Sequence, residues 1–185
     1  LILTSQEGSM ELARDTASIL EKEGKGIILD QFGNTDNPKA HYEGTGPEIW
    51  RDTNKKITHF ISSMGTTGTI VGTSSYLKEQ NSAIQIVGVQ PEEGAQIPGI
   101  RKWPDEYLPK IFTSKNIDTI INVNQENAEN TARALARQEG IFSGASTGGA
   151  LFVALKIAKE NPSAVIVSIA CDRGDRYLST GIFPA

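Results

Sequence analysis

The chain has 185 residues, 18 of them glycine, a formal net charge of −4 and a single cysteine, Cys171. Its length suits one good-sized domain, or one domain plus part of another. A lone cysteine excludes an internal disulfide and fits a reducing cytoplasm, where we expect the protein to work. The negative charge argues against nucleic acid as the main partner, and no run of about 18 apolar residues predicts a membrane span.

The first third of the chain predicts short elements separated by turns. Leu1–Thr4 predicts an apolar strand entered midway and the sequence does not begin with Met, so we expect a piece of a longer protein. Ser9 is a candidate cap for a helix that Gly24 can end in the left-handed conformation. The expected inward face of this helix is Leu12, Thr16, Ile19 and Leu20. A second strand, a polar loop and a short helix are expected at Gly26–Leu29, at Gln31–Pro38 and around Pro47–Asp52.

From residue 53 onward strands and helices alternate, after a domain junction that we expect at Lys55 and Lys56. The predicted strands are Ile57–Ser62, Ile84–Val89, Thr119–Val123 and Ala164–Ala170. Helices are predicted from the loop after the first strand to about Gln80, from a cap at Asn124 to Gly140, and from the Ser143–Gly149 loop to Asn161-Pro162. The last two helices are expected to turn inward Ala128, Thr131, Ala132 and Leu135, and Leu151, Ala154, Leu155 and Ala158. This alternation predicts an α/β fold with a largely parallel sheet in a three-layer αβα arrangement, and ligands beyond the carboxyl ends of the strands.

The stretch Ser62–Thr69 follows a predicted strand and opens a predicted helix. Its glycines, hydroxyls and unpaired N–H groups are typical of a phosphate-binding loop, because a helix N-terminus leaves donors free and is partly positive. It contains no lysine, so it does not match the loop that binds nucleoside triphosphates. An ordinary strand-to-helix turn is the simpler alternative. A dinucleotide-binding site, with Glu92 or Glu93 as the ribose-binding acid, lacks the first Gly-x-Gly of that pattern.

Ser143–Gly149 is a second stretch of small residues. Alone it predicts only a tight turn, but beside the first loop its Ser146 is a candidate hydroxyl donor to a shared pocket. Arg101 and Lys102 lie next to Trp103 in a long loop between predicted elements. They are either a solvated basic spot or an anion clamp on a mobile loop that Trp103 anchors.

The remaining titratable side chains predict no further chemistry. His41 and His59 lack metal-ligand spacing, so we expect both to be structural and no metal to bind. Cys171 has no partner cysteine and is expected to be an inert thiol. The charged residues that follow it are expected to form a local ion-pair network, namely Asp172, Arg173, Asp175 and Arg176.

Five separated motifs, in the right order, together resemble one family of enzymes. They are Gln31–Pro38, Gly65–Thr69, Ile97–Pro104, Gly140–Gly149 and Cys171–Gly181. The chain resembles the fold-type II pyridoxal-phosphate enzymes, specifically the cysteine synthases, over its whole length. The stretches Pro98–Pro104 and Cys171–Thr180 are similar to the B branch of that family rather than the A branch.

The resemblance implies pyridoxal phosphate as cofactor and the tryptophan synthase β-like fold. It implies a β-replacement in cysteine biosynthesis, in which an activated serine such as O-acetylserine loses acetate and sulfide or thiosulfate adds. The cofactor supplies the electron sink, and the protein supplies orientation and electrostatics. Small-molecule substrates and a homodimer are the family expectation.

Residue by residue, the resemblance assigns the cofactor phosphate to Gly65, Thr66, Thr67, Gly68 and Thr69. Ser146 matches the family serine that hydrogen-bonds the pyridine nitrogen, and a neutral hydroxyl there favours elimination over transamination. Cys171 is expected near the ring as a pocket wall rather than a nucleophile.

The resemblance also implies a set of substrate-binding residues. Gln31 matches a family residue near the substrate carboxylate, and Gly99 lies on the segment that closes over substrate. Arg101 and Lys102 are expected to bind an anionic sulfur donor, which their charge favours.

One family feature is missing. The Schiff-base lysine lies in an Asn-Pro-x-(Gly/Ala)-Ser-x-Lys-Asp-Arg-like pattern that this chain does not contain, and Lys39, after Asn37-Pro38, lacks the flanking motif. The family's Ser/Thr/Gly/Asn loop for the substrate carboxylate is absent too. We therefore expect the C-terminal two thirds of a cysteine synthase, with no catalytic residue in the chain and no activity of its own. Residues 1–52 would be the remnant of a smaller N-terminal α/β domain, and residues 53–185 the large cofactor-binding α/β domain.

Two alternatives remain open. A serine/threonine dehydratase or a cystathionine β-synthase relative would use the same cofactor, but the Arg101 loop argues against both because their substrates call for no such anion clamp. A non-catalytic fragment that binds only phosphate or a partner protein is favoured by the absence of the lysine.

Overall fold

The computed structural model describes residues 1–183. In that part of the chain, no helix is long and apolar enough to cross a membrane. The α-helices are α1 (Ser9–Lys22), α2 (Asp36–Ala40), α3 (Gly46–Asp52), α4 (Gly68–Gln80), α5 (Gln125–Glu139) and α6 (Ala145–Glu160). The strands are β1 (His59–Ser63), β2 (Gln85–Pro91), β3 (Thr119–Val123) and β4 (Ile166–Ser168). A π-helical turn, η1 (His41–Thr45), and two 3₁₀ turns, η2 (Asp105–Tyr107) and η3 (Gly174–Tyr177), complete the elements.

The strands form one sheet in the order β3-β2-β1-β4, and every pair is parallel. β1 is interior: His59 lies opposite Gln85 of β2 on one side and opposite Ile166 of β4 on the other. The predicted parallel α/β fold is therefore confirmed, and β3 has the predicted bounds. β4 is shorter than the predicted Ala164–Ala170.

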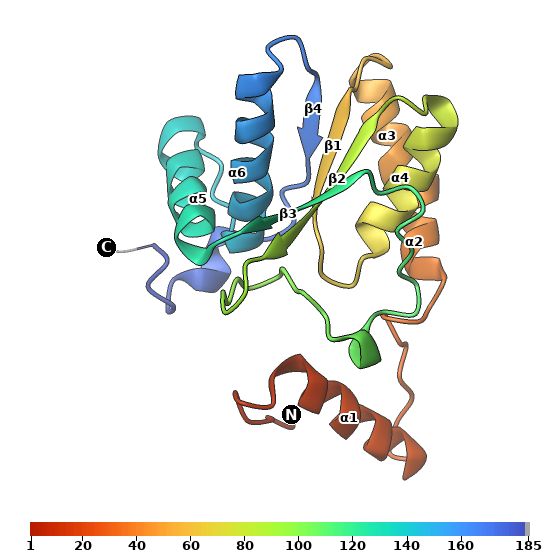
Figure 1. Cartoon of the computed structure of the whole chain (residues 1–185). Coiled ribbons are helices and arrows are strands. Elements are labelled where there is room, and N and C mark those ends of the chain that lie inside the picture. Colours follow the sequence, from red (N-terminus) through yellow and green to blue (C-terminus); the bar gives the residue numbers. More distant parts are fainter. Residues whose placement is uncertain (184–185) are drawn as a thin grey trace.

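Helices cover both faces of the sheet, as Figure 1 shows. Successive strand residues point to opposite faces, so neighbours in sequence join different cores. Ile61 and Val87 pack with α5 and α6, whereas Phe60 and Ile86 pack with α3 and α4. Both cores are nearly closed to solvent, with Phe60 and Ile61 each at 0% exposure. The arrangement is the expected three-layer αβα.

The short helical run formed by α2 and η1 lies directly against α4. A Cβ on Gly72 would stand 2.0 Å from the Pro38 carbonyl oxygen, so only glycine permits this approach. The expected Gln31–Pro38 loop is accordingly shorter, because α2 begins at Asp36. The predicted helix near Pro47–Asp52 is confirmed as α3.

The residues that start and end α5, and those that end α6, act through local interactions, and they were predicted correctly. The Asn124 side chain accepts from the Asn127 N–H at 2.8 Å and caps α5. Gly140 ends α5 in the left-handed conformation with φ of +69°. α6 begins at Ala145, inside the small-residue stretch expected to be a loop, and ends before Asn161. Its inward face is Ala150, Val153 and Ala154, whereas the predicted Leu155 is 51% exposed.

The two strands expected near the N-terminus are wrong. Neither Leu1–Thr4 nor Gly26–Leu29 is regular, and neither pairs with another strand among residues 1–183. Ile27 and Leu29 are 88% and 83% exposed. An apolar run becomes a strand only where another strand supplies hydrogen-bond partners, and these segments have none here.

The helix α1 forms where its spacing predicts, but its predicted inward face is wrong. Leu12 and Ile19 are exposed, and no residue of α1 is buried. Ser9 does not cap the helix; its hydroxyl accepts a hydrogen bond from Arg101 instead. Figure 1 shows α1 apart from the sheet and its covering helices, so the apolar side chains of α1 have no core to pack against. Gly24 follows the helix with φ of +70°, as expected.

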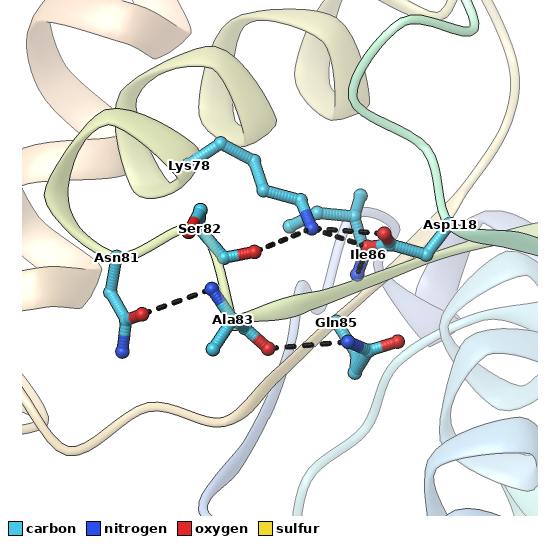
Figure 2. A network of polar contacts seen from close by, with 7 residues as sticks. All are labelled: Lys78, Asn81, Ser82, Ala83, Gln85, Ile86 and Asp118. Atoms are coloured by element: carbon cyan, nitrogen blue, oxygen red, sulfur yellow. Dashed lines mark hydrogen bonds and ion pairs between the residues drawn. The ribbon is translucent and has the colours of Figure 1, made fainter.

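A polar network fastens the end of α4 to the start of β2 and β3 (Figure 2). Lys78 donates to the Ser82 carbonyl oxygen at 3.1 Å and pairs with Asp118 at 2.8 Å. The same carboxylate accepts from the buried Ile86 N–H at 2.7 Å. Burial by itself would raise the pKa of Asp118, but the hydrogen bonds from Lys78 and Ile86 outweigh it and lower that pKa. The ionised carboxylate thus stabilises the folded chain.

We expect Asp118→Ala to lower the free energy of unfolding by about 1–3 kcal/mol at neutral pH, because it leaves a buried N–H without an acceptor. Since the folded pKa lies below the unfolded one, this stability is present above about pH 4 and is lost as the pH falls through the folded value. Urea unfolding at pH 7 and at successively lower pH values measures both effects.

The matched control is Asp52→Ala, which removes an ion pair with Arg51. The side chain of Asp52 is 65% exposed and that of Arg51 is 71% exposed. The substitution should change the free energy of unfolding by less than about 0.5 kcal/mol. Equal losses for the two variants, or a loss at Asp118 that does not shrink at acid pH, would contradict this account of the network.

Candidate functional site

A cavity of about 200 Å³ lies where the strands β1, β2 and β4 lead into their following loops. Its lining comes from four separated parts of the chain: Ser63, Gly65, Thr66, Thr67 and Thr69; Gly99; Ser146; and Cys171 and Asp172. Parallel strands bring these parts together because their carboxyl ends meet at one edge of the sheet. Most of the residues singled out from the sequence for a cofactor thus surround one space. Gly68 is the exception, since it lies behind the loop against Asn37.

The loop between β1 and α4 offers hydrogen-bond donors without acceptors. No hydrogen bond within residues 1–183 uses the backbone N–H of Gly65, Thr66 or Thr67. Thr67 has φ of +73° and is only 4% exposed, yet its hydroxyl has no partner. A buried hydroxyl without a partner costs free energy, and it lines the cavity. The loop is therefore arranged for a ligand that accepts hydrogen bonds.

Ser146 lies in the first turn of α6 at 2% exposure. Its carbonyl oxygen accepts from the Ser63 hydroxyl at 2.6 Å, which ties α6 to β1. Its own hydroxyl lies 3.1 Å from the Cys171 sulfur. Desolvation raises the pKa of the Cys171 thiol, as does the neighbouring Asp172 charge, against hydrogen bonds from Ser146 and Thr147 that lower it. The thiol is protonated at neutral pH, and a protonated thiol is a poor nucleophile.

Asp172 does not join the predicted ion-pair network. Arg173 pairs with Asp175 at 2.7 Å, but the Asp172 carboxylate turns inward and accepts from the N–H groups of Ser146 and Thr147. Two free donors at the start of α6 attract a carboxylate more strongly than an exposed arginine does, because the helix end is partly positive.

The loop from Pro91 to Pro109 closes one side of the cavity. The Arg101 N–H donates to the Met64 carbonyl oxygen at 2.8 Å, and the Trp103 indole donates to that of Gly65 at 2.7 Å. The expected anchoring by Trp103 is thus seen. Gly99 has φ of +86°, and a Cβ there would lie 2.9 Å from the Ser146 side chain. Only glycine allows the loop to approach so closely.

The charged side chains of this loop lie outside the cavity. Arg101 donates to the Ser9 hydroxyl at 3.0 Å and lies over the Trp103 ring, and Lys102 is exposed. Both line a larger hollow of about 1090 Å³ between the N-terminal segment and residues 91–104. The hollow also carries Glu7, Glu92 and Glu93, so its charge is mixed.

Gln31 is exposed and does not line the cavity. Its carbonyl oxygen accepts from the Asn37 amide at 2.7 Å, and the same amide donates to the Thr66 hydroxyl at 3.2 Å. Asn37 therefore joins the Gln31 turn to the loop after β1. No spacing in the sequence marks Asn37 for this position.

His41 is a second residue that sequence reasoning missed. Its Nε2 lies 3.1 Å from the Thr69 hydroxyl and its Nδ1 lies 2.9 Å from the Thr45 hydroxyl. Burial lowers the pKa of His41, so the ring is neutral at pH 7 and holds Thr69 by hydrogen bonding alone. The contact spans 28 residues, and only the packing of η1 on α4 creates it.

The side chains around the cavity fit a phosphorylated aromatic cofactor. The loop after β1 contributes free N–H groups, threonine hydroxyls and the N-terminus of α4, all of which suit a phosphate. The same cavity has the buried Ser146 hydroxyl, which suits a heterocyclic nitrogen. No lysine or arginine is among the lining residues, so hydrogen bonds and the helix end would carry the anion.

Comparison with known proteins identifies the family. A family model described as "Pyridoxal-phosphate dependent enzyme" matches residues 1–172. The chain belongs to this family. The site and the family agree, since the cavity is lined both by the loop after β1, whose donors lack acceptors within residues 1–183, and by the Ser146 hydroxyl.

The chain is similar to cysteine synthase B of Pseudomonas aeruginosa, with 60% identity over 99% of this chain and 61% of that protein. It is 59% identical to cysteine synthase B of Escherichia coli, over 99% of this chain and 60% of the relative. The chain thus spans about three fifths of the length of these curated relatives.

Solved structures share the fold. A cysteine synthase from Entamoeba histolytica superimposes with a TM-score of 0.87 at 35% identity, over 100% of this chain and 58% of that one. A hydrogen sulfide-producing enzyme from Fusobacterium nucleatum gives a TM-score of 0.88 at 32% identity, over 96% of this chain and 63% of that one. The expected resemblance to fold-type II pyridoxal-phosphate enzymes is confirmed.

Because the Thr67 hydroxyl has no partner within residues 1–183, its removal should stabilise the fold and weaken ligand binding. We expect Thr67→Val to raise the free energy of unfolding by about 1 kcal/mol, because it removes a buried polar group without a partner. It should weaken the binding of inorganic phosphate about tenfold, the equivalent of one hydrogen bond to a charged group. Urea unfolding and calorimetric titration measure the two changes.

The control is Thr73→Val, which removes another buried, unpartnered hydroxyl of α4 that does not line the cavity. It should stabilise the chain similarly and leave phosphate binding unchanged. If Thr67→Val instead destabilised the chain and bound phosphate normally, the hydroxyl would serve the fold rather than a ligand.

Proposed function

We propose that this chain is the cofactor-binding part of a cysteine synthase that makes cysteine from an activated serine and a sulfur donor. The observation that carries the proposal is the cavity itself, which is lined both by unpaired donors of the Gly65–Thr69 loop and by the Ser146 hydroxyl. The likeness to cysteine synthase B over almost the whole chain supports it.

On this proposal each part of the cavity has one task. The loop Gly65–Thr69 binds the cofactor phosphate, with Thr69 held by His41. Ser146 hydrogen-bonds the ring nitrogen as a neutral group, and Cys171 forms the wall beside it. When bound, pyridoxal phosphate supplies the electron sink for the replacement reaction. The protein supplies orientation and a water-poor environment.

We propose that the larger hollow admits the second substrate. Arg101 and Lys102 line it and carry the positive charge that an anionic donor such as thiosulfate requires. Gly99 stands between hollow and cavity, against Ser146, where closure of the loop would bring donor and cofactor together. Gln31 lies near the phosphate loop through Asn37 and would face the substrate carboxylate in the complete protein.

The wider organisation follows the family. We propose residues 1–52 as the remainder of a smaller domain and residues 53–185 as the larger one. The helices α2 and α3 pack on α4, whereas the hydrogen bonds that α1 makes to later residues reach Arg101 and Tyr107. A cytoplasmic homodimer with small-molecule substrates is proposed for the complete enzyme.

A second candidate is a chain that binds the cofactor without performing chemistry. The observation in its favour is that no lysine is among the residues lining the cavity. A cystathionine-forming relative is a third, since an O-acetylserine-dependent cystathionine β-synthase from Helicobacter pylori shares the fold with a TM-score of 0.83 at 33% identity over 98% of this chain and 62% of that one.

We expect the isolated chain to bind pyridoxal phosphate reversibly. Absorbance titration should show saturable binding, while borohydride reduction followed by intact mass should show no stoichiometric lysine adduct. Ser146→Ala should weaken cofactor binding about tenfold and leave inorganic phosphate binding unchanged, because it removes a contact only to the ring.

The matched control is Ser143→Ala, which removes a buried hydroxyl three residues earlier that does not line the cavity. It should leave both ligands unaffected. A full lysine adduct would show that another lysine reaches the cavity and would refute the proposal of a purely cradling site. Unchanged cofactor binding in Ser146→Ala would refute the assigned role of Ser146.

Binding of the sulfur donor is testable separately. We expect Arg101→Gln to weaken thiosulfate binding to the cofactor-loaded chain about tenfold, as the loss of a charge-assisted hydrogen bond requires. Arg137→Gln changes an exposed arginine on α5 and should have no effect. Calorimetric titration in the same buffer compares the two. Equal effects of both variants would mean that only overall charge matters and that Arg101 is no donor site.

A further inference from the structure

Two helix N-termini face the cavity, and their donors are occupied in opposite ways. At the start of α4, the N–H groups of Thr66 and Thr67 have no acceptor within residues 1–183. At the start of α6, the N–H groups of Ser146 and Thr147 both donate to the Asp172 carboxylate at 3.0 Å. Only the α4 end is therefore open to an anion.

The Asp172 carboxylate is fully engaged and ionised. Besides the two N–H groups, it accepts from the Thr147 hydroxyl and from the Tyr177 hydroxyl at 2.9 Å. Burial by itself would raise the pKa of Asp172, but the hydrogen bonds from Thr147 and Ser146 outweigh it and lower that pKa. The carboxylate also raises the pKa of Tyr177, after burial as the first cause, so that hydroxyl stays a donor. A fixed negative charge thus stands at the N-terminus of α6, beside a cavity whose lining carries no positive side chain.

Capping alone does not call for this charge. An asparagine or serine oxygen caps a helix about as well as a carboxylate, and burying a carboxylate is costly, although only a carboxylate supplies two acceptor oxygens for the four donors here. What the charge adds is an electrostatic difference between the two helix N-termini at the cavity. It cancels the positive end of α6 and leaves that of α4 uncompensated.

We propose that Asp172 is a positioning residue that fixes the direction in which a phosphorylated ligand lies in the cavity. It occupies the donors of α6 and repels phosphate there, so the phosphate goes to the Gly65–Thr69 loop. The Ser146 hydroxyl is then left as a neutral partner for the ring. This inference rests on the proposed binding of pyridoxal phosphate at the cavity.

The test compares Asp172→Asn with Asp175→Asn, which removes the same charge from an exposed residue three positions later. In Asp172→Asn we expect a second inorganic phosphate to bind, or the first to bind about tenfold more tightly, because the α6 end becomes positive. Selectivity for pyridoxal phosphate over inorganic phosphate should fall by a similar factor. Asp175→Asn should change neither quantity.

A merely structural role gives a different result. The midpoint temperature of thermal unfolding would be lower in Asp172→Asn. Its affinities for pyridoxal phosphate and for inorganic phosphate would both fall, and the ratio of the two affinities would stay unchanged. That outcome would overturn the proposal.

A measurement on the unchanged chain keeps the proposal testable if Asp172→Asn does not fold. Inorganic phosphate should shift the amide NMR signals of Thr66, Thr67 and Thr69, and not those of Ser146 and Thr147. Equal shifts at both helix ends would overturn the role of Asp172 while leaving the phosphate site standing. If inorganic phosphate did not bind even at the concentration at which pyridoxal phosphate saturates the chain, the proposed phosphate site would be refuted, and this inference with it.

Discussion

The parallel pairing of β1 with both of its neighbours is the constraint on which the site depends. β1 carries His59 opposite Gln85 on one side and opposite Ile166 on the other, so three strands end at the same edge. The alternation of Phe60 and Ile61 between two cores fixes the register, because a shift of one residue would move each side chain into the other core. The loops that form the cavity are therefore positioned by core packing.

This dependence explains which features the sequence predicts. The bounds of β3 and the caps of α5 rest on local patterns, as at Asn124 and Gly140, and these were correct, whereas β1 and β2 begin and end one or two residues later than predicted. The Gly65–Thr69 loop and Ser146 were also predicted as candidates, because small residues between a strand and a helix are a local signal, and most of them line one cavity. Asp172 was misjudged, since its carboxylate could bond a neighbouring arginine or a distant helix end, and the sequence does not rank the two.

The periodicity of apolar residues predicts the presence of a helix more reliably than it predicts which part of the protein that helix packs against. The spacing of Leu12 and Ile19 correctly indicates α1, but both side chains are exposed. α1 instead meets later residues through Arg14, which donates to the Tyr107 carbonyl oxygen at 2.7 Å and lies over the Phe32 ring at 4.3 Å. Apolar spacing states which side chains share a face, and only the rest of the fold decides whether that face is covered.

The cavity holds polar groups that the fold itself does not satisfy, and this links stability to ligand binding. Thr67 keeps a left-handed backbone and a buried hydroxyl without a partner, both of which cost free energy. The carbonyl groups of Met64 and Gly65 accept hydrogen bonds from Arg101 and Trp103, and these bonds hold the loop in that conformation. A ligand that satisfies these donors binds only the folded chain, so at a hundred times its dissociation constant it adds about 2.7 kcal/mol of stability. The unsatisfied groups that make the loop costly in the folded chain are therefore the ones that a ligand accepting hydrogen bonds would satisfy.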